Sequence, residues 1–189
     1  MEDRQPTAPG LPWRWGITAD DLTYDFPCAE LLAGPVRSLY RAIDVDASVD
    51  LAYRWLCQMR VAPYSYDLID NLGKRSPQTL TAGADDLEVG MAMMVFRITS
   101  FEPGVHVSGL TLPRAEKIYG KLAVTYLVVP RGETASRIVV RIDAAKGGLL
   151  SRFRSWLLGW GDLVMMRKQL LNLKALAERD QAAVVTAPA

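Results

Sequence analysis

The chain has 189 residues, of which 50% are apolar and 23% charged, and its formal net charge is +1. This length is typical of one domain with a sizeable core, and the balanced charge excludes a general nucleic-acid-binding protein, which needs a basic excess. One histidine and two cysteines exclude a four-cysteine zinc site and any site that needs two histidines, so we expect no metal site.

The two ends of the chain predict a partly mobile N-terminal extension and a flexible tail. Residues 1–38 contain Trp13, Trp15 and Phe26 without clear periodicity, which favours an extension packed on the domain. Residues 39–180 form the predicted domain, and residues 181–189 the tail. We expect a cytoplasmic protein, because the chain begins without a secretory signal and has no run of about 18 apolar residues.

The first regular elements are a strand and a helix. In Leu39–Asp46 the residues Leu39, Arg41, Ile43 and Val45 alternate with others and predict one face of a strand. Ser48 then has the position of a helix N-cap, and the helix that follows stops before Pro63. Asp70–Gly73 predicts a turn.

The middle of the chain predicts an antiparallel sheet. In the last strand, Ile138, Val140 and Ile142 point one way, while Arg137, Arg141 and Asp143 point the other. We therefore expect one buried face and one face in water. The predicted strands, separated by Pro- and Gly-containing turns, are Met93–Glu102, Val105–Thr111, Lys117–Val129 and Ala135–Ala144.

A long amphipathic helix is predicted from Leu149 to Glu178, because apolar residues recur at steps of three and four. Gly159 and Gly161 predict a break or kink near its middle, with Asp162 restarting the helix. The order of strand, helical segment, several strands and a long last helix is typical of an α+β domain whose curved antiparallel sheet wraps around that helix.

Four stretches resemble the SRPBCC or START-like helix-grip superfamily, and in particular its bacterial polyketide cyclase/dehydrase-like members. The most specific is the tyrosine- and aspartate-containing segment Tyr64–Gly73. Met91 departs from the family pattern, because it follows Leu87–Gly90 where many members have an acid. The stretches are Arg41–Leu56, Tyr64–Gly73, Leu87–Gly90 and Arg167–Lys174.

The resemblance implies the helix-grip fold, with short helices after the first strand and a cavity between the sheet and the C-terminal helix. It implies a hydrophobic ligand that is aromatic, polyketide-like or lipid-like, and either binding alone or a cyclase or aromatase reaction without metal or redox cofactor. Fold does not choose between these activities. The alternative is a lipid carrier or accessory protein that touches membrane surfaces weakly through its C-terminal helix, since residues 101–189 carry 13 basic and 7 acidic residues.

The candidate catalytic residues are Tyr66, Asp67 and Asp70. Two carboxyl groups three residues apart share a helix face, where their pKa values can separate and support proton transfer. The alternative is that both carboxyl groups hold local turns. His106 is expected to be a bystander. The candidate ligand-binding residues, most of which could also be ordinary core or half-buried anchors, are Trp55, Tyr64, Tyr66, Asn71, Phe96, Tyr126, Trp156, Trp160 and Met165.

Overall fold

A computed structural model describes residues 10–71, 73–146 and 149–186, without the side chains of residues 69, 70 and 149–158. Seven strands form one sheet in the order β1-β2-β7-β6-β5-β4-β3, and every neighbouring pair is antiparallel except β1 and β2. The strands are β1 (Arg14–Trp15), β2 (Val36–Val45), β3 (Ala92–Met93), β4 (Phe96–Glu102), β5 (His106–Thr111), β6 (Leu122–Pro130) and β7 (Ser136–Ala145).

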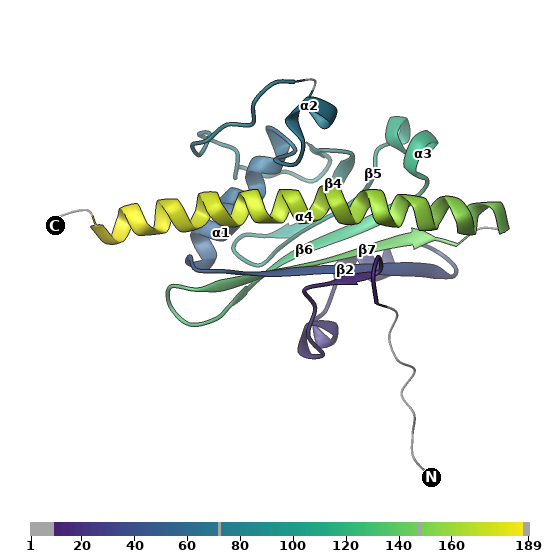
Figure 1. The fold of residues 1–189 in the computed structure, drawn as a ribbon, viewed down its shortest axis with the longest axis horizontal. Helices are drawn as coiled ribbons and strands as arrows, with labels where there is room; N and C mark the ends of the chain where they lie inside the picture. Colours follow the sequence, from purple (N-terminus) through teal and green to yellow (C-terminus); the bar gives the residue numbers. More distant parts are fainter. Residues whose placement is uncertain (1–9, 72, 147–148, 187–189) are drawn as a thin grey trace, which may run out of the picture.

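One long helix lies along this sheet, as Figure 1 shows, with α1 beside its C-terminal half. Short 3-10 helices precede β2 and follow α1. The helices are α1 (Val49–Cys57), α2 (Asp67–Asp70), α3 (Pro113–Tyr119) and α4 (Leu149–Thr186), and the 3-10 helices are η1 (Asp20–Thr23), η2 (Pro27–Glu30) and η3 (Gln58–Arg60). This arrangement confirms the predicted α+β class, and α4 runs eight residues beyond its predicted end, into the expected tail.

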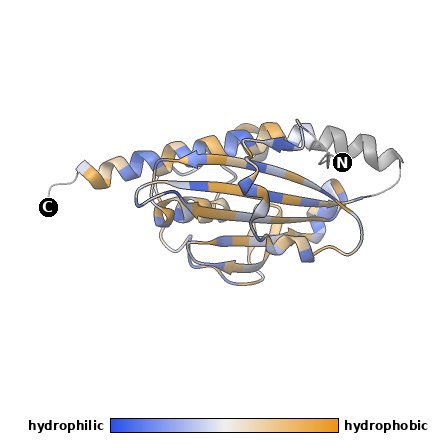
Figure 2. Cartoon of the chain, turned by 90° about the horizontal axis from the view of Figure 1, so that it is seen from below, coloured by the Kyte–Doolittle hydropathy of each residue, from blue (hydrophilic) through white to orange (hydrophobic). Residues whose placement is uncertain are grey.

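The main core lies between α1, α4 and the inner face of the sheet. Figure 2 shows apolar and polar residues interspersed along the coloured part of α4, and the buried residues Leu163, Leu170 and Leu173 mark the side that faces the sheet. Leu170 and Leu173 of α4 are completely buried there, and each such leucine stabilises the fold by about 1.5–3 kcal/mol relative to an exposed one.

Ser48 caps α1 as predicted, because its side chain accepts a hydrogen bond from the Leu51 amide at 3.4 Å.

Two of the predicted strands begin or divide differently. The chain after Pro113 forms α3 instead of starting a strand at Lys117, because proline is favoured in a first helical turn and Gly120 ends the helix at a φ of 81°. β6 therefore begins only at Leu122. The predicted strand from Met93 is interrupted by a two-residue turn, where Met94 has a φ of 54°.

The predicted break of the long helix is wrong. α4 continues through Gly159 and Gly161 without interruption. A Cβ atom on Gly159 would lie 3.2 Å from the indole of Trp13, whereas one on Gly161 would meet nothing within 4 Å. Gly159 therefore leaves room for Trp13 to pack against the helix, and surrounding contacts outweigh the low helix propensity of the two glycines.

The expectation that one sheet face meets water is also wrong. The N-terminal segment crosses the outer face, where Phe26 and Cys28 pack against the sheet. Arg137 on that face is 3% exposed, and its guanidinium donates hydrogen bonds of 2.8 and 2.7 Å to the Asp21 carboxylate of η1. Asp143, on the same face, is completely buried. A buried ion pair thus fastens the extension to the sheet, which alternation along β7 alone does not reveal.

Candidate functional site

A cavity of about 1030 Å³ lies between the inner face of the sheet, α3, α4 and the segment that follows α1. Its apolar wall includes Leu39 and Ile142 from the sheet, Phe96 from β4 and Met166 from α4. Trp13 also lines it, so the N-terminal segment that precedes β2 contributes to the wall. The cavity is the space that the wrapped sheet and the long helix leave between them.

An ion pair connects the sheet and α4 at this cavity. Asp162 lines the cavity, and its Oδ2 accepts a hydrogen bond of 2.7 Å from Nη2 of Arg41, which lies behind it in β2. Arg41 is completely buried, and its Nη1 donates to the backbone oxygens of Trp13 and Tyr40. The Asp162 side chain is 27% exposed, and in the described part of the chain its Oδ1 makes no hydrogen bond. Asp162 therefore places a carboxylate at the cavity surface, with Arg41 behind it.

Burial dominates the electrostatics of this pair. It raises the pKa of the Asp162 carboxyl above its ordinary value, and the nearby positive charge of Arg41 opposes that rise. Burial also lowers the pKa of Arg41, although Asp162 acts in the opposite direction. A carboxyl group with a raised pKa exchanges protons closer to neutral pH, which suits both hydrogen bonding and acid–base chemistry.

Two more polar side chains border the same space. Tyr126 lies in the cavity wall, and its hydroxyl donates to the sulfur of Met166 at 3.7 Å, which is a weak acceptor on a flexible side chain. Gln169 donates through Nε2 to the Pro63 backbone oxygen at 2.6 Å, while its buried Oε1 has no hydrogen-bond partner in the described residues. The apolar wall therefore holds a small number of polar groups that a ligand could engage.

Three of the residues predicted to bind a ligand do line this cavity, namely Phe96, Tyr126 and Met165. They come from β4, β6 and α4, so the fold brings together side chains far apart in the sequence.

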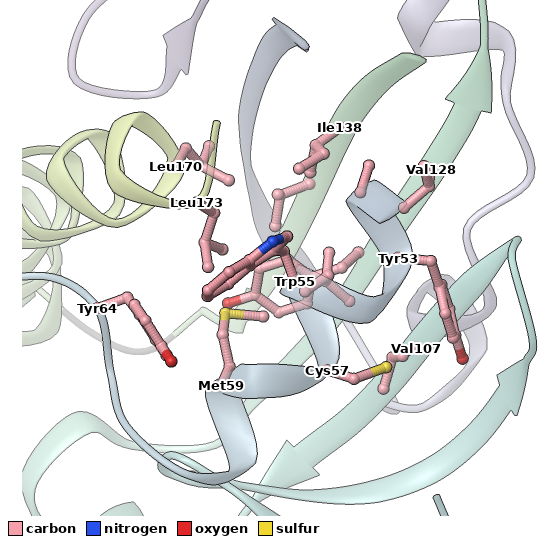
Figure 3. Packing of buried hydrophobic residues seen from close by; sticks show 14 of the residues in the cluster. Tyr53, Trp55, Cys57, Met59, Tyr64, Val107, Val128, Ile138, Leu170 and Leu173 are labelled. Atoms are coloured by element: carbon pink, nitrogen blue, oxygen red, sulfur yellow. The ribbon is translucent and has the colours of Figure 1, made fainter. Parts of the chain in front are cut away.

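Trp55 and Tyr64 lie outside the cavity lining. Both are completely buried in the core, where their rings pack edge to face with centroids 6.0 Å apart. Figure 3 shows Trp55 beside Met59 and Leu173, within closely packed side chains. The indole Nε1 of Trp55 donates to Asp180 at 3.0 Å, which binds α1 to α4. In this structure both side chains pack the core.

The segment with the candidate catalytic residues folds back on itself. Asp67 accepts hydrogen bonds from the amide and hydroxyl of Ser76 at 2.8 and 2.5 Å. Burial opposes but does not outweigh these bonds, so the Asp67 pKa is lowered. Tyr66 is 39% exposed, and the Asn71 side chain donates to the Lys74 backbone oxygen. None of these three predicted residues lines the cavity.

The remaining residues singled out in the sequence either lie outside the cavity lining or have side chains that are not described. The side chains of Asp70 and Trp156 lie outside the described residues. Trp160 is 38% exposed on α4 and is not in the cavity lining. His106 also lies outside the lining, and burial lowers its pKa. Among the residues whose side chains are described, no three His, Cys, Asp or Glu side chains gather closely enough to hold a metal ion.

Sequence reasoning missed Asp162 as a site residue. Alternation along β2 correctly predicts that Arg41 points inward, where an arginine needs an anionic partner. Asp162 occupies a position adjoining the apolar stripe of α4, between Gly161 and the buried Leu163. An inward arginine and an acid beside the helical stripe were the two signals, but only the fold shows that they meet.

The structure resembles solved structures of norcoclaurine synthase from Thalictrum flavum. A point mutant in complex with a transition-state analogue matches with a TM-score of 0.52 and 12% identity, over 79% of this chain and 98% of that chain. The complex with dopamine and hydroxybenzaldehyde matches with a TM-score of 0.50 and 12% identity, over 82% and 90%. The fold is the helix-grip fold. This confirms the fold expected from the resemblance to the SRPBCC superfamily.

The di-domain ARO/CYC StfQ from the steffimycin biosynthetic pathway also matches, with a TM-score of 0.48 and 16% identity. The match covers 78% of this chain and 52% of StfQ. No protein-family model and no curated protein matches the sequence. Within the described residues, no helix is both long and apolar enough to cross a membrane.

Proposed function

We propose that the chain binds an apolar small molecule, aromatic or polyketide-like, in the cavity between the sheet and α4. The observation that carries this proposal is a largely apolar cavity of about 1030 Å³ whose lining includes the partly exposed carboxylate of Asp162. Ligand sites typically have volumes of about 300–1,000 Å³, mostly apolar walls and a few polar groups that fix orientation. The norcoclaurine synthase complex with dopamine and hydroxybenzaldehyde supports the proposal at the level of the fold.

The polar groups give the ligand an orientation. A ligand hydroxyl donates to the carboxylate of Asp162, whose charge is held in place by Arg41. A ligand carbonyl accepts from the Tyr126 hydroxyl once the weakly held sulfur of Met166 moves aside. Both contacts lie in an apolar environment, where hydrogen bonds are stronger than in water.

Binding is tested with the neutral fluorescent probe N-phenyl-naphthylamine. Ala144 lines the cavity, so the substitution Ala144→Phe fills part of it. We expect a loss of probe affinity of at least about tenfold, equivalent to about 1.4 kcal/mol. The matched control is Ala183→Phe at an exposed position of α4 outside the cavity lining, where affinity should change less than about twofold. Equal affinity in both variants would contradict the proposal.

Cyclisation or aromatisation is a second candidate, favoured by the raised pKa of Asp162 beside the cavity. In this reaction Asp162 accepts a proton from the activated carbon of the substrate and returns it to an oxygen of the intermediate, so no cofactor takes part. Asp162→Asn should then abolish product formation from a poly-β-keto substrate while probe binding persists. If Asp67→Asn abolishes the reaction instead, with Asp162→Asn fully active, the assignment to the Tyr66–Asp70 segment is correct and Asp162 has no catalytic role.

A lipid-carrier function would use the outer side of α4. There Val164 and Leu171 are 51% and 40% exposed, near Arg167 and Lys168. The opposite side of the helix is buried against the sheet and is not available to a membrane. Salt-sensitive sedimentation with anionic vesicles would support this alternative, and no sedimentation at low salt would eliminate it.

A further inference from the structure

Four basic side chains gather at the rim of the cavity. Arg37, Arg114, Lys117 and Lys121 all line it, and the last three are exposed to solvent while Arg37 is half-buried. They come from β2, from α3 and from the residue before β6, so they approach the opening from separate parts of the chain. The whole chain has a net charge of only +1, and this concentration of cations is therefore a local feature.

Sheet register fixes the position of Arg37. It pairs with Ala144 of β7, which pairs with Leu122 of β6, so these three residues lie in one row across the inner face. The Arg37 guanidinium lies 4.5 Å from the centre of the Trp13 ring. Stacking on an indole holds the side chain in place without neutralising its charge. Arg37 thus presents a fixed positive charge at the end of the cavity wall.

The opposite part of the rim is built by α3. Arg114 and Lys117 are three residues apart on this helix and therefore share a face. Lys121 follows directly after Gly120, and its backbone oxygen accepts a hydrogen bond from Ala145 in the neighbouring β7. The turn at Gly120 consequently brings a third cation to the same end of the sheet as Arg37.

Among the described residues, these four cations have no acidic partner. In the described part of the chain, none of the four forms an ion pair. The acidic residues of the described cavity lining are Glu116 and Asp162, and Asp162 is already paired with Arg41. The sequence between Asp143 and Asp162, which includes the start of α4, contains no acidic residue. Arg60 also lines the cavity, but its guanidinium donates hydrogen bonds to the backbone oxygens of Gly83, Ala84 and Asp86. These bonds hold Arg60 in place, so it is not counted among the rim cations.

We infer that the cavity selects an amphipathic ligand whose apolar body carries a terminal anionic group, held by the cations of the rim. This inference rests on the proposed binding function and specifies its ligand class. Arg37 and Arg41 are four residues apart along β2, a separation of about 13 Å at about 3.3 Å per residue. The ligand therefore places its anion at Arg37 and a hydroxyl group deeper, at Asp162 beside Arg41. Carboxylate and phosphate share this chemistry.

The test displaces N-phenyl-naphthylamine from the protein with three ligands of equal chain length, namely laurate, dodecyl phosphate and dodecanol. We expect both anions to displace the probe at concentrations at least about tenfold lower than the alcohol. The order of laurate and dodecyl phosphate identifies which anion fits the rim. The advantage of the anions should diminish between about 0.01 M and about 1 M salt, because the Debye length falls from about 30 Å to about 3 Å.

Charge removal supplies the matched control. One variant replaces Arg37, Arg114, Lys117 and Lys121 with Gln, and the other replaces Lys74, Arg75, Arg97 and Lys168, which are exposed and do not line the cavity. Both variants lose the same charge. Only the rim variant should lose the preference for anions over the alcohol.

The outcomes separate the two proposals. If the neutral probe does not bind the wild-type cavity, the proposed function itself fails. If the probe binds but the alcohol competes as well as the anions, or if both charge variants lose the preference equally, the inference about the rim is overturned while the cavity remains a binding site.

Discussion

The ion pair between Arg41 and Asp162 gives the most quantitative prediction for stability. Asp162→Ala removes the carboxylate and leaves a guanidinium that is completely buried in the core. Its Nη1 keeps the backbone oxygens of Trp13 and Tyr40, but Nη2 loses its acceptor and Nε already has no hydrogen-bond partner in the described residues. The substitution therefore leaves a buried charge without compensation.

The expected cost is about 3 kcal/mol. Breaking a buried ion pair by removing one partner typically costs about 3–5 kcal/mol. The lower end applies here, because the Asp162 side chain is 27% exposed at the cavity and water can replace part of the lost interaction. Replacing both partners with apolar residues, in the double variant Arg41→Met and Asp162→Leu, should bring the free energy of unfolding back to within about 1 kcal/mol of wild type.

Urea denaturation followed by circular dichroism measures these free energies in wild type, both single variants and the double variant. The double-mutant cycle should give a coupling of at least about 2 kcal/mol between the two side chains. A cost of less than about 1 kcal/mol for Asp162→Ala would contradict this prediction. So would a double variant in which the costs of the two single substitutions simply add.

Three further predictions concern α4 and the N-terminal extension. Gly161→Ala should raise the free energy of unfolding by about 0.5–1 kcal/mol in thermal or urea denaturation, because the new Cβ meets nothing within 4 Å. Gly159→Ala should not raise it, because the new Cβ would lie 3.2 Å from the indole of Trp13. Asp21→Ala should release the extension from Arg137, so that the buried Cys28 reacts with a thiol reagent at neutral pH. Peptide mapping identifies the labelled cysteine, and equal labelling of Cys57 would indicate general unfolding instead. Burial acts to raise the pKa of Asp21, but its hydrogen bonds with Arg137 and Thr18 outweigh burial, so the pKa lies below its ordinary value of 3.8. Wild type should therefore be more stable than Asp21→Asn above pH 3.8 and should lose this advantage as the pH falls through the lowered pKa. An advantage that persists at still lower pH would contradict this assignment.

Much of the fold follows from local patterns. Alternation along β2 and β7 and the apolar stripe of α4 predict the sheet and the long helix, whereas the helix-grip fold is expected from the resemblance of four stretches to a known superfamily. The local pattern failed where long-range contacts decide the structure. Gly159 stays helical because Trp13 packs against it, and Arg137 is buried because the N-terminal segment covers it. Neither contact has a signal within its own stretch of sequence.

The candidate site is less accessible to sequence reasoning than the fold. Phe96, Tyr126 and Met165 lie on separate elements and line one cavity, as apolar residues on inner faces can be expected to do. The spacing of Asp67 and Asp70 suggests a catalytic pair, but the hydrogen bonds that Asp67 accepts from Ser76 show that such a segment can equally hold a turn. The pairing of Arg41 with Asp162 depends on how α4 crosses the sheet, and no spacing in the sequence encodes that angle.

Methionine methyl signals test the central claim, that a ligand occupies the cavity between the sheet and α4. Protein labelled with carbon-13 at the methionine methyl groups is titrated with N-phenyl-naphthylamine and followed by NMR. We expect the shifts to concentrate on the methionines that line the cavity and to be smaller for the two on and beside β3 that do not line it. Shifts confined to the latter two, or no shift at a probe concentration that saturates fluorescence, would contradict it. The lining methionines are Met59, Met94, Met165 and Met166, the two compared with them are Met91 and Met93, and Met1 lies outside the described residues.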